Sequence, residues 1–363
     1  MKLQYSKQRA KPNISGAIPF RYAFTTTVNA PSFPEKKVSR VSLRILCEEL
    51  DPLDNSYDSA LSFLKSRAIT IGHRVYIDDE LKQGMKRSVG KYRRGFLVGF
   101  PFKCPVPFKT NYHNAPDLGE AMFLHRLGKI CRMISKLSGK QFGLTIFEET
   151  QALLPVFNVD SKEAVIFRKG LHELLHLLKL NNCIVIEPLI SFLAVSKIEY
   201  KTRLNKLAHK VKTVKTYKPL LDQILPTIAL SINVNALLML DSQKYIHNLF
   251  AHYVSEKKDR LLFETAYKYI AFILLQKESK FIEKYFSSFL HFSLCPKKGR
   301  ISIYPTIKSA RVWPHHGVPI VYSKNGKRHF LIEYYSDFVK EFGGRDIIRV
   351  VDQDNNFLYY QVQ

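Results

Sequence analysis

The segment that most constrains the fold begins with a run of five apolar or small residues, Phe96–Phe100. A run without polar positions is typical of a strand buried on both faces, as in a parallel sheet. Pro101 ends this strand, and Pro105 and Pro107 keep the next residues from pairing or coiling. Lys103 therefore follows the carboxyl end of the strand, where open α/β sheets bind their ligands.

A helix N-terminus follows this loop. Asn114 or Asp117 is suited to be the N-cap, with Glu120 in the first turn and apolar positions recurring at Leu124 and Leu127. A strand, a cationic loop and a helix N-terminus in succession form the geometry of a phosphate or anion site. The alternative is structural, because a lysine in a stiff loop can also lay its aliphatic stem on apolar surface.

Strand-like and helix-like segments alternate beyond this stretch. Leu144–Phe147 and Cys183–Ile186 are short apolar runs, and the segment from about Lys162 to Lys179 between them is predicted to be a helix capped by Ser161 or Asp160. This alternation predicts an α/β fold with a largely parallel sheet and flanking helices.

The two ends of the chain differ from this pattern. Residues 1–40 contain several prolines and scattered charges, which predicts an extended N-terminal arm. Residues 41–300 are expected to form the α/β catalytic core. Residues 301–363 are expected to be a β-rich segment that completes the active site, because Asn325-Gly326 lies between strand-like runs and predicts a type I′ hairpin.

The chain is strongly basic, with 56 lysines and arginines against 31 acidic residues and a net charge of +25. Such a charge suits a polyanionic partner, but lysines scattered over solvated faces explain it as well. The densest basic segment, residues 197–218, is predicted to be helical. We expect a solvated helix face there rather than a nucleic-acid site, because no aromatic RNA-binding motif accompanies it.

The cysteines and the hydropathy limit the compartment and the type of site. Five widely spaced cysteines without a CxxC pair argue against a disulfide framework and a zinc–cysteine site. Residues 1–12 lack the apolar core of a signal peptide, and the apolar stretch 224–240 is interrupted by Pro226, Asn233 and Asn235. We therefore expect a cytoplasmic protein without a membrane partner.

One short motif suggests a zinc hydrolase. His172 and His176, with Glu173 between them, match the HExxH pattern. On a helix, however, the neighbouring leucines form the buried stripe, and the histidines share a wet face with Lys169 and Lys179. Two lysines beside the imidazoles are unfavourable for another cation, so we expect no metal site.

A second histidine pair lies near the C-terminal strands. His315 and His316 follow the only tryptophan, Trp313, in a turn bounded by Pro314 and Gly317. Two adjacent imidazoles suit proton transfer near neutral pH. Capping of backbone groups at the entry of a hairpin explains them equally well.

Several motifs, in order, resemble those of the isonitrile (isocyanide) synthases of the pyoverdine and dityrosine biosynthesis superfamily. The residues FPFKCP and PDLGE resemble the paired family motifs FPxKSPN and PDLGE. The segment LHFSLCP with the following RISI resembles the family pattern IRLSIHP with KISI, and PHHGV resembles PWHGV. The resemblance extends from about Gly95 to Asn325.

This resemblance implies a Rossmann-like fold and a reaction. The family condenses the α-amine of an amino acid with the ketone of a ketose phosphate, typically ribulose 5-phosphate, and converts the amine to an isonitrile. No metal or redox cofactor is implied. The implied partners are the amino acid and the sugar phosphate, with an iron- and 2-oxoglutarate-dependent oxygenase as a candidate next enzyme in the pathway.

The resemblance also implies roles for individual residues. Lys103 would bind phosphate or carboxylate, Glu120 would transfer a proton, His316 would be an acid or base, and His291 is the fourth catalytic candidate. The implied substrate-binding residues are Asp117, Glu148, Ser293, Arg300, Arg311 and His315.

The chain departs from the family pattern at several of these positions. Glu148-Glu149 stands in place of an Asp-Gly pair, His291 in place of an arginine, Cys295 in place of a histidine, and His315 in place of the tryptophan. Cys104 and Val106 stand in place of Ser and Asn. Histidine does not reproduce the bidentate grip of arginine on phosphate. We therefore expect a divergent member, and a different amine or second substrate or a basic nucleic-acid-binding protein are the alternatives.

Overall fold

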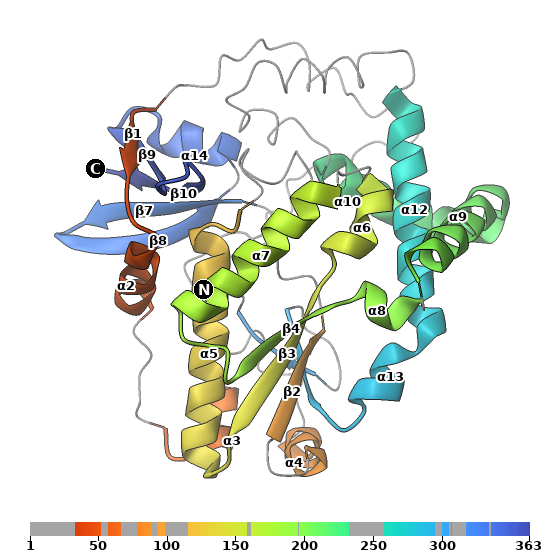
Figure 1. Ribbon diagram of the computed structural model, residues 1–363, viewed down its shortest axis with the longest axis horizontal. Helices are drawn as coiled ribbons and strands as arrows, with labels where there is room; N and C mark the ends of the chain where they lie inside the picture. Colours follow the sequence, from red (N-terminus) through yellow and green to blue (C-terminus); the bar gives the residue numbers. More distant parts are fainter. Residues whose placement is uncertain are drawn as a thin grey trace.

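Two five-stranded sheets organise the chain in the computed structural model (Figure 1). The structure describes residues 33–51, 57–66, 78–88, 93–98, 115–157, 161–194, 196–231, 258–294, 300–304, 306, 317–333 and 335–363.

The first sheet is entirely parallel, with strand order β4-β3-β2-β5-β6. Its strands are β2 (Arg93–Val98), β3 (Phe142–Glu148), β4 (Ile184–Pro188), β5 (Leu290–Ser293) and β6 (Ile301–Ser302). The chain adds β3 and β4 on one side of β2 and then returns to add β5 and β6 on the other. The predicted parallel α/β fold is thereby confirmed, and its topological switch point lies between β2 and β5.

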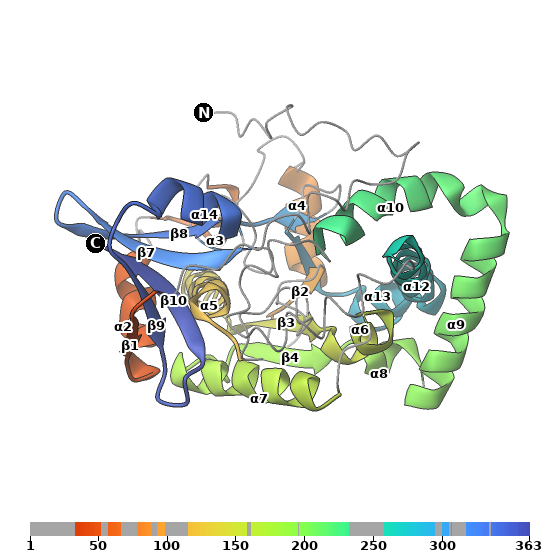
Figure 2. The ribbon, with the colours of Figure 1, turned by 90° about the horizontal axis from the view of Figure 1, so that it is seen from above.

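Helices cover both faces of this sheet (Figure 2). Apolar residues of the helices before β2 and of the two crossover helices share one core with one face of the sheet. These helices are α2 (Val41–Leu50), α3 (Ala60–Lys65), α4 (Asp78–Arg87), α5 (Leu118–Ser138) and α7 (Ser161–Leu177). A second, aromatic-rich core on the other face contains Phe96 and Phe147 and residues of the remaining helices. These are α6 (Thr150–Phe157), α8 (Ile190–Leu193), α9 (Lys197–Thr213), α10 (Lys218–Ser231), α12 (Lys258–Ser279) and α13 (Phe281–Phe286). The short 3-10 helix η1 (Lys215–Tyr217) connects α9 to α10 and has no buried residue.

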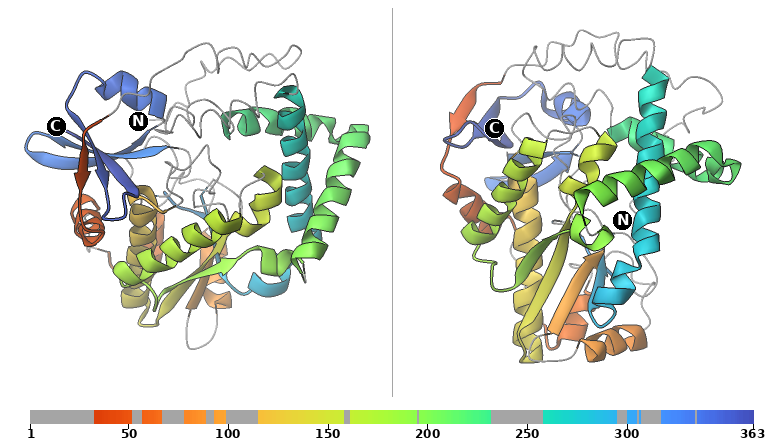
Figure 3. Two further views of the ribbon diagram at one scale, coloured as in Figure 1. Left: turned by 45° about the horizontal axis from the view of Figure 1, so that its top comes forward. Right: turned by 45° about the vertical axis from the view of Figure 1, so that its right-hand side comes forward.

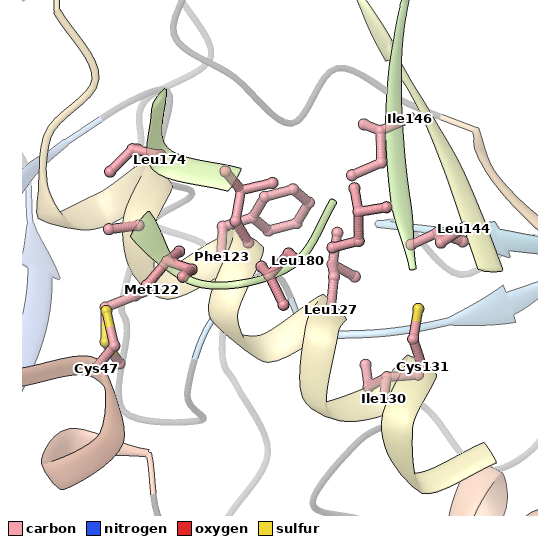
Figure 4. Packing of buried hydrophobic residues seen from close by; sticks show 14 of the residues in the cluster. Cys47, Met122, Phe123, Leu127, Ile130, Cys131, Leu144, Ile146, Leu174 and Leu180 are labelled. Atoms are coloured by element: carbon pink, nitrogen blue, oxygen red, sulfur yellow. The ribbon is translucent and has the colours of Figure 1, made fainter. Parts of the chain in front are cut away.

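Helix α5 lies at the centre of the first core. Its side chains are buried on nearly every side, because the first sheet, α2, α3, α7 and the second sheet all contact it. Gly128 permits the closest approach, since a Cβ atom there would lie 2.2 Å from Cδ2 of Leu180. Figure 4 shows this packing with labels on Cys47, Met122, Phe123, Leu127, Ile130, Cys131, Leu144, Ile146, Leu174 and Leu180.

The second sheet has the order β1-β9-β10-β7-β8 and lies on the far side of α5 from the first (Figure 3). Its strands are β1 (Glu35–Lys37), β7 (Val318–Lys324), β8 (Lys327–Glu333), β9 (Ile347–Val351) and β10 (Phe357–Val362). One face packs on α2 and α5, and α14 (Tyr335–Phe342) packs on the other. The predicted hairpin is confirmed, because Asn325 and Gly326 both have positive φ, at 53° and 71°.

Several elements differ from the sequence-based expectations. The strand expected at Phe96–Phe100 begins earlier, at Arg93, because Arg93–Leu97 pair in register with Phe142–Ile146. Residues 78–87, for which the sequence analysis predicted no element, form a helix. β1 lies within residues 1–40, the segment expected to be an extended arm. β6 lies just after residue 300, the expected end of the α/β core, and pairs with β5 of that core. Among the described helices, none combines the length and hydrophobicity that crossing a lipid bilayer requires.

Candidate functional site

The candidate site is the carboxyl edge of the first sheet at its switch point. The strands β2, β3 and β5 all end at this edge, and α5 begins there because it follows β2 in a parallel crossover. Open α/β sheets bind ligands in the crevice at this position. Four predicted site residues, Lys103, Arg311, His315 and His316, lie outside the residues that the structure describes.

Asp117 and Glu120 form a capping box at the start of α5. The Gly119 N–H donates to Oδ1 of Asp117 at 2.7 Å, and the Asp117 N–H donates to Oε2 of Glu120 at 3.0 Å. Both side chains are buried. Of the two candidate caps, Asp117 is therefore the one used. The motif PDLGE has a structural function in addition to any catalytic one, because it fixes where α5 begins at the ligand-binding edge.

Glu148 is the last residue of β3 and is only 1% exposed. Neither of its carboxylate oxygens makes a hydrogen bond of ordinary geometry to described residues. Burial raises the pKa of Glu148, and this effect outweighs the hydroxyl of Thr150, the N–H groups of Thr150 and Gln151, and the charge of Arg168, all of which favour the ionised form. The edge thus holds a buried carboxyl group that keeps its proton to higher pH than an ordinary glutamate.

Ser293 ends β5 and lies in register between Val98 of β2 and Ser302 of β6. Ser293 and Ser302 are both buried. Two adjacent buried hydroxyl groups on one face of the sheet, beside the switch point, provide polar atoms for orienting a ligand. The sequence analysis missed Ser302, although the alternation of apolar and polar residues in RISI places it on the same face as Arg300.

His291 has a structural partner. Its Nε2 donates a hydrogen bond to the Phe286 carbonyl at 2.8 Å, and its ring lies edge-on to Phe96 with a centroid distance of 6.0 Å. Burial lowers its pKa, as do the nearby cations of Arg300 and Arg87. His291 therefore stays neutral at neutral pH and ties β5 to the end of α13.

Arg300 lies beside His291, because it directly precedes Ile301, the residue that pairs with Phe292. The two side chains are two residues further from the carboxyl edge than Ser293 and Ser302. The structure thus brings Asp117, Glu120, Glu148 and Ser293 to one edge and places His291 and Arg300 below it.

The HExxH motif lies on the surface of α7. The histidines and Glu173 are exposed, and Leu171, Leu174 and Leu175 are buried, as predicted. Glu173 forms ion pairs with Arg40 at 3.6 Å and Lys169 at 3.8 Å. No group of three histidine, cysteine or acidic residues within the described ranges is arranged to hold a metal ion.

Comparison with known proteins agrees with this fold. The family model described as "Pyoverdine/dityrosine biosynthesis protein" matches residues 94–333. This range includes all of the first sheet except Arg93, and it includes the β7–β8 hairpin. Among curated proteins, none matches this chain. The crystal structure of the PvcA protein from Pseudomonas aeruginosa has the same fold, with a TM-score of 0.59 and 15% sequence identity over 84% of this chain and 100% of that one. The chain belongs to the pyoverdine/dityrosine biosynthesis protein family.

Proposed function

We propose that this protein is a biosynthetic enzyme that joins the α-amine of an amino acid to the ketone carbon of a ketose phosphate, ribulose 5-phosphate in the family pattern. The product would be an isonitrile or a related C–N compound. Family membership and the fold support a biosynthetic enzyme of this type. The chemistry of the carboxyl edge supports the particular reaction.

Glu148 is the observation that carries the proposal. Condensation of an amine with a ketone needs a group that removes a proton from the attacking nitrogen and returns one to the oxygen that leaves as water. A carboxyl group is suited to both steps when its pKa is shifted toward neutral pH. Glu148 is such a group, because burial raises its pKa and its oxygens lack ordinary hydrogen bonds to described residues.

We also propose roles in this reaction for the other predicted site residues. Lys103 would bind the phosphate or carboxylate, since it follows β2 closely in the sequence and β2 ends at the switch point. His316 would be a second acid or base, and Glu120 would transfer a proton through the oxygen that the cap does not use. The substrate-binding group comprises Asp117, Ser293, Arg300, Arg311 and His315.

The test is incubation of the purified protein with ribulose 5-phosphate and each aromatic amino acid in turn. Formation of an isonitrile would be followed by its infrared stretch and by product mass. We expect product with the wild type, loss of product in Lys103→Ala, and a large decrease in Glu148→Gln. Lys324→Ala, an exposed lysine on the β7–β8 hairpin, is the matched control and should retain full activity. A folded wild-type protein that forms no product with any amino acid would contradict the proposal.

A second candidate keeps the site and changes the second substrate. It is favoured by His291, which stands where the family pattern has arginine and which donates its Nε2–H to a backbone carbonyl. A neutral imidazole held in this way offers no bidentate grip on a phosphate. Thermal shifts with ketose phosphates and with their unphosphorylated sugars distinguish the two candidates. Stabilisation by the phosphate forms alone supports ribulose 5-phosphate, and equal stabilisation by both supports the second candidate.

A further inference from the structure

Helix α9 carries a group of exposed lysines that the candidate site does not use. One stripe of the helix, formed by Tyr200, Leu204, Ala208 and Val211, is buried against α12 and its neighbours. This packing fixes which side chains face outward. The helix lies at the end of the molecule opposite the second sheet, and no described helix or strand covers its outer side (Figures 2 and 3).

The outward side is almost free of acidic residues. Glu199 is the only acidic residue of α9, which the structure describes in full. Ion pairs engage Arg203, with Glu199 and Glu278, and Lys212, with Glu264. Within the described residues no ion pair is found for the exposed lysines of α9 and the turn after it, Lys197, Lys201, Lys206, Lys210, Lys215 and Lys218.

The lysines are spread over the outward half of the helix. At 3.6 residues per turn, Lys201 lies beside the buried stripe on one side, Lys210 lies toward the other side, and Lys206 lies opposite Leu204. The uncharged polar side chains of Thr202 and Asn205 share this outward half with Lys206. The outward half therefore combines cationic and hydrogen-bonding side chains.

We propose that α9 is a binding site for duplex DNA, with the helix lying in the major groove. An α-helix with its side chains is about 10–12 Å wide, which matches a major groove about 12 Å wide. In that position Lys201 reaches phosphates on one wall of the groove, and the long side chains of Lys206 and Lys210 reach phosphates on the other. Thr202 and Asn205 face the base edges.

Other polyanions fit this surface less well. Insertion into a membrane surface needs an apolar outer face, and Ile198, 81% exposed, is the single large apolar side chain that α9 itself presents outward. Single-stranded nucleic acid needs aromatic platforms for base stacking, and the only aromatic residue of α9 other than a histidine, Tyr200, is buried. The major groove of duplex RNA is too deep and narrow for side chains to read.

The test is fluorescence anisotropy with a short, labelled, mixed-sequence DNA duplex and the full-length protein. The variant Lys206→Glu/Lys210→Glu reverses the charge of two outward lysines. The control Lys324→Glu/Lys327→Glu makes the same change of charge at exposed lysines of the β7–β8 hairpin. We expect the α9 variant to bind the duplex at least about tenfold more weakly, and the control to change binding less than about threefold. Loss of two phosphate contacts should also decrease the slope of log K against log salt by about two.

Three results would overturn the proposal. Equal weakening in both variants would show that net charge alone attracts DNA. Tighter binding to the single strand of the same sequence, or to phosphatidylserine vesicles, would assign the surface to another ligand. If the folded protein does not bind the duplex at low salt, α9 is not a DNA-binding site. Far-ultraviolet circular dichroism of both variants confirms that they are folded, and none of these measurements depends on the proposed reaction.

Discussion

At the start of α5, the side chains of Asp117 and Glu120 each accept a hydrogen bond from a backbone N–H group of the first turn. Oε2 of Glu120 accepts the Asp117 N–H at 3.0 Å, and Oδ1 of Asp117 accepts the Gly119 N–H at 2.7 Å. The motif in which we expected substrate binding and proton transfer thus also builds the helix that bounds the candidate site. The capping role and the proposed proton-transfer role of Glu120 can be tested separately, because the cap needs only one acceptor oxygen.

The first prediction concerns this separation. Glu120→Ala removes the acceptor and should lower the free energy of unfolding by roughly 1 kcal/mol or more. Glu120→Gln keeps an acceptor oxygen and should retain most of the stability while losing the capacity to transfer a proton. Urea unfolding and turnover, measured on both variants, check this. If the glutamine variant is stable and fully active, Glu120 acts only as a cap.

The second prediction concerns Glu148 and pH. Because its pKa is raised in the folded protein, the stability that protonated Glu148 contributes is complete below the ordinary value of 4.5 and is lost as pH rises through the raised value. Glu148→Gln carries no charge and should be free of this loss. The difference in melting temperature between this variant and the wild type should therefore increase from pH 4 to pH 8. Turnover by the variant should be lower than turnover by the wild type.

Melting curves across this pH range provide the measurement. Glu187→Gln, at a half-buried position on β4 that pairs with Phe147, is the matched control for the change from glutamate to glutamine. A Glu148→Gln difference that is independent of pH would mean that the carboxyl group titrates normally in the folded protein.

The third prediction concerns His125, a buried residue of α5. Its Nε2 has no hydrogen-bond partner among the described residues, and burial with the cations of Lys129, Arg132 and Arg126 lowers its pKa to about 3. The unfolded chain binds a proton near pH 6.5 and the folded protein does not, so stability falls as pH drops below 6.5. Between pH 6.5 and pH 5 this loss amounts to about 2 kcal/mol.

Urea unfolding of the wild type and of His125→Leu at these two pH values measures the effect. The leucine variant cannot titrate and should lose less stability over the same interval. Parallel losses in the two proteins would show that other groups cause the acid sensitivity.

The fourth prediction concerns the contact between Gly128 and Leu180. A Cβ atom at residue 128 would lie 2.2 Å from Cδ2 and 3.2 Å from Cδ1 and Cγ of Leu180. Gly128→Ala should therefore destabilise the protein by roughly 1–3 kcal/mol through overpacking. Gly344→Ala, where no atom lies within 4 Å of the new Cβ, should change stability by less than about 0.5 kcal/mol.

A compensating change sharpens this test. In the double variant Gly128→Ala/Leu180→Ala the clash is absent, so the two substitutions should be clearly non-additive. Additive effects would show that the helix adjusts without strain at Gly128.

The elements that sequence predicted well are those with a local cause. Asn325-Gly326 specified its turn because both residues tolerate positive φ, and the leucines of α7 specified a buried stripe by their spacing. The parallel sheet followed from apolar runs alternating with helices. Helix α4 was missed because its residues carry little hydrophobic signal, and the order of the second sheet was not predictable because its strands come from both ends of the chain.

By itself the sequence determined the fold class and the family motifs, since propensity, periodicity and short motifs are properties of neighbouring residues. Only the tertiary structure decided what those residues do to one another. In the folded chain Asp117 and Glu120 form a capping box, and His291 donates a hydrogen bond to the Phe286 carbonyl. Glu148 is buried at the end of β3. Burial and long-range contacts set the pKa of a carboxyl group and the partner of an imidazole, and both depend on segments far apart in the chain.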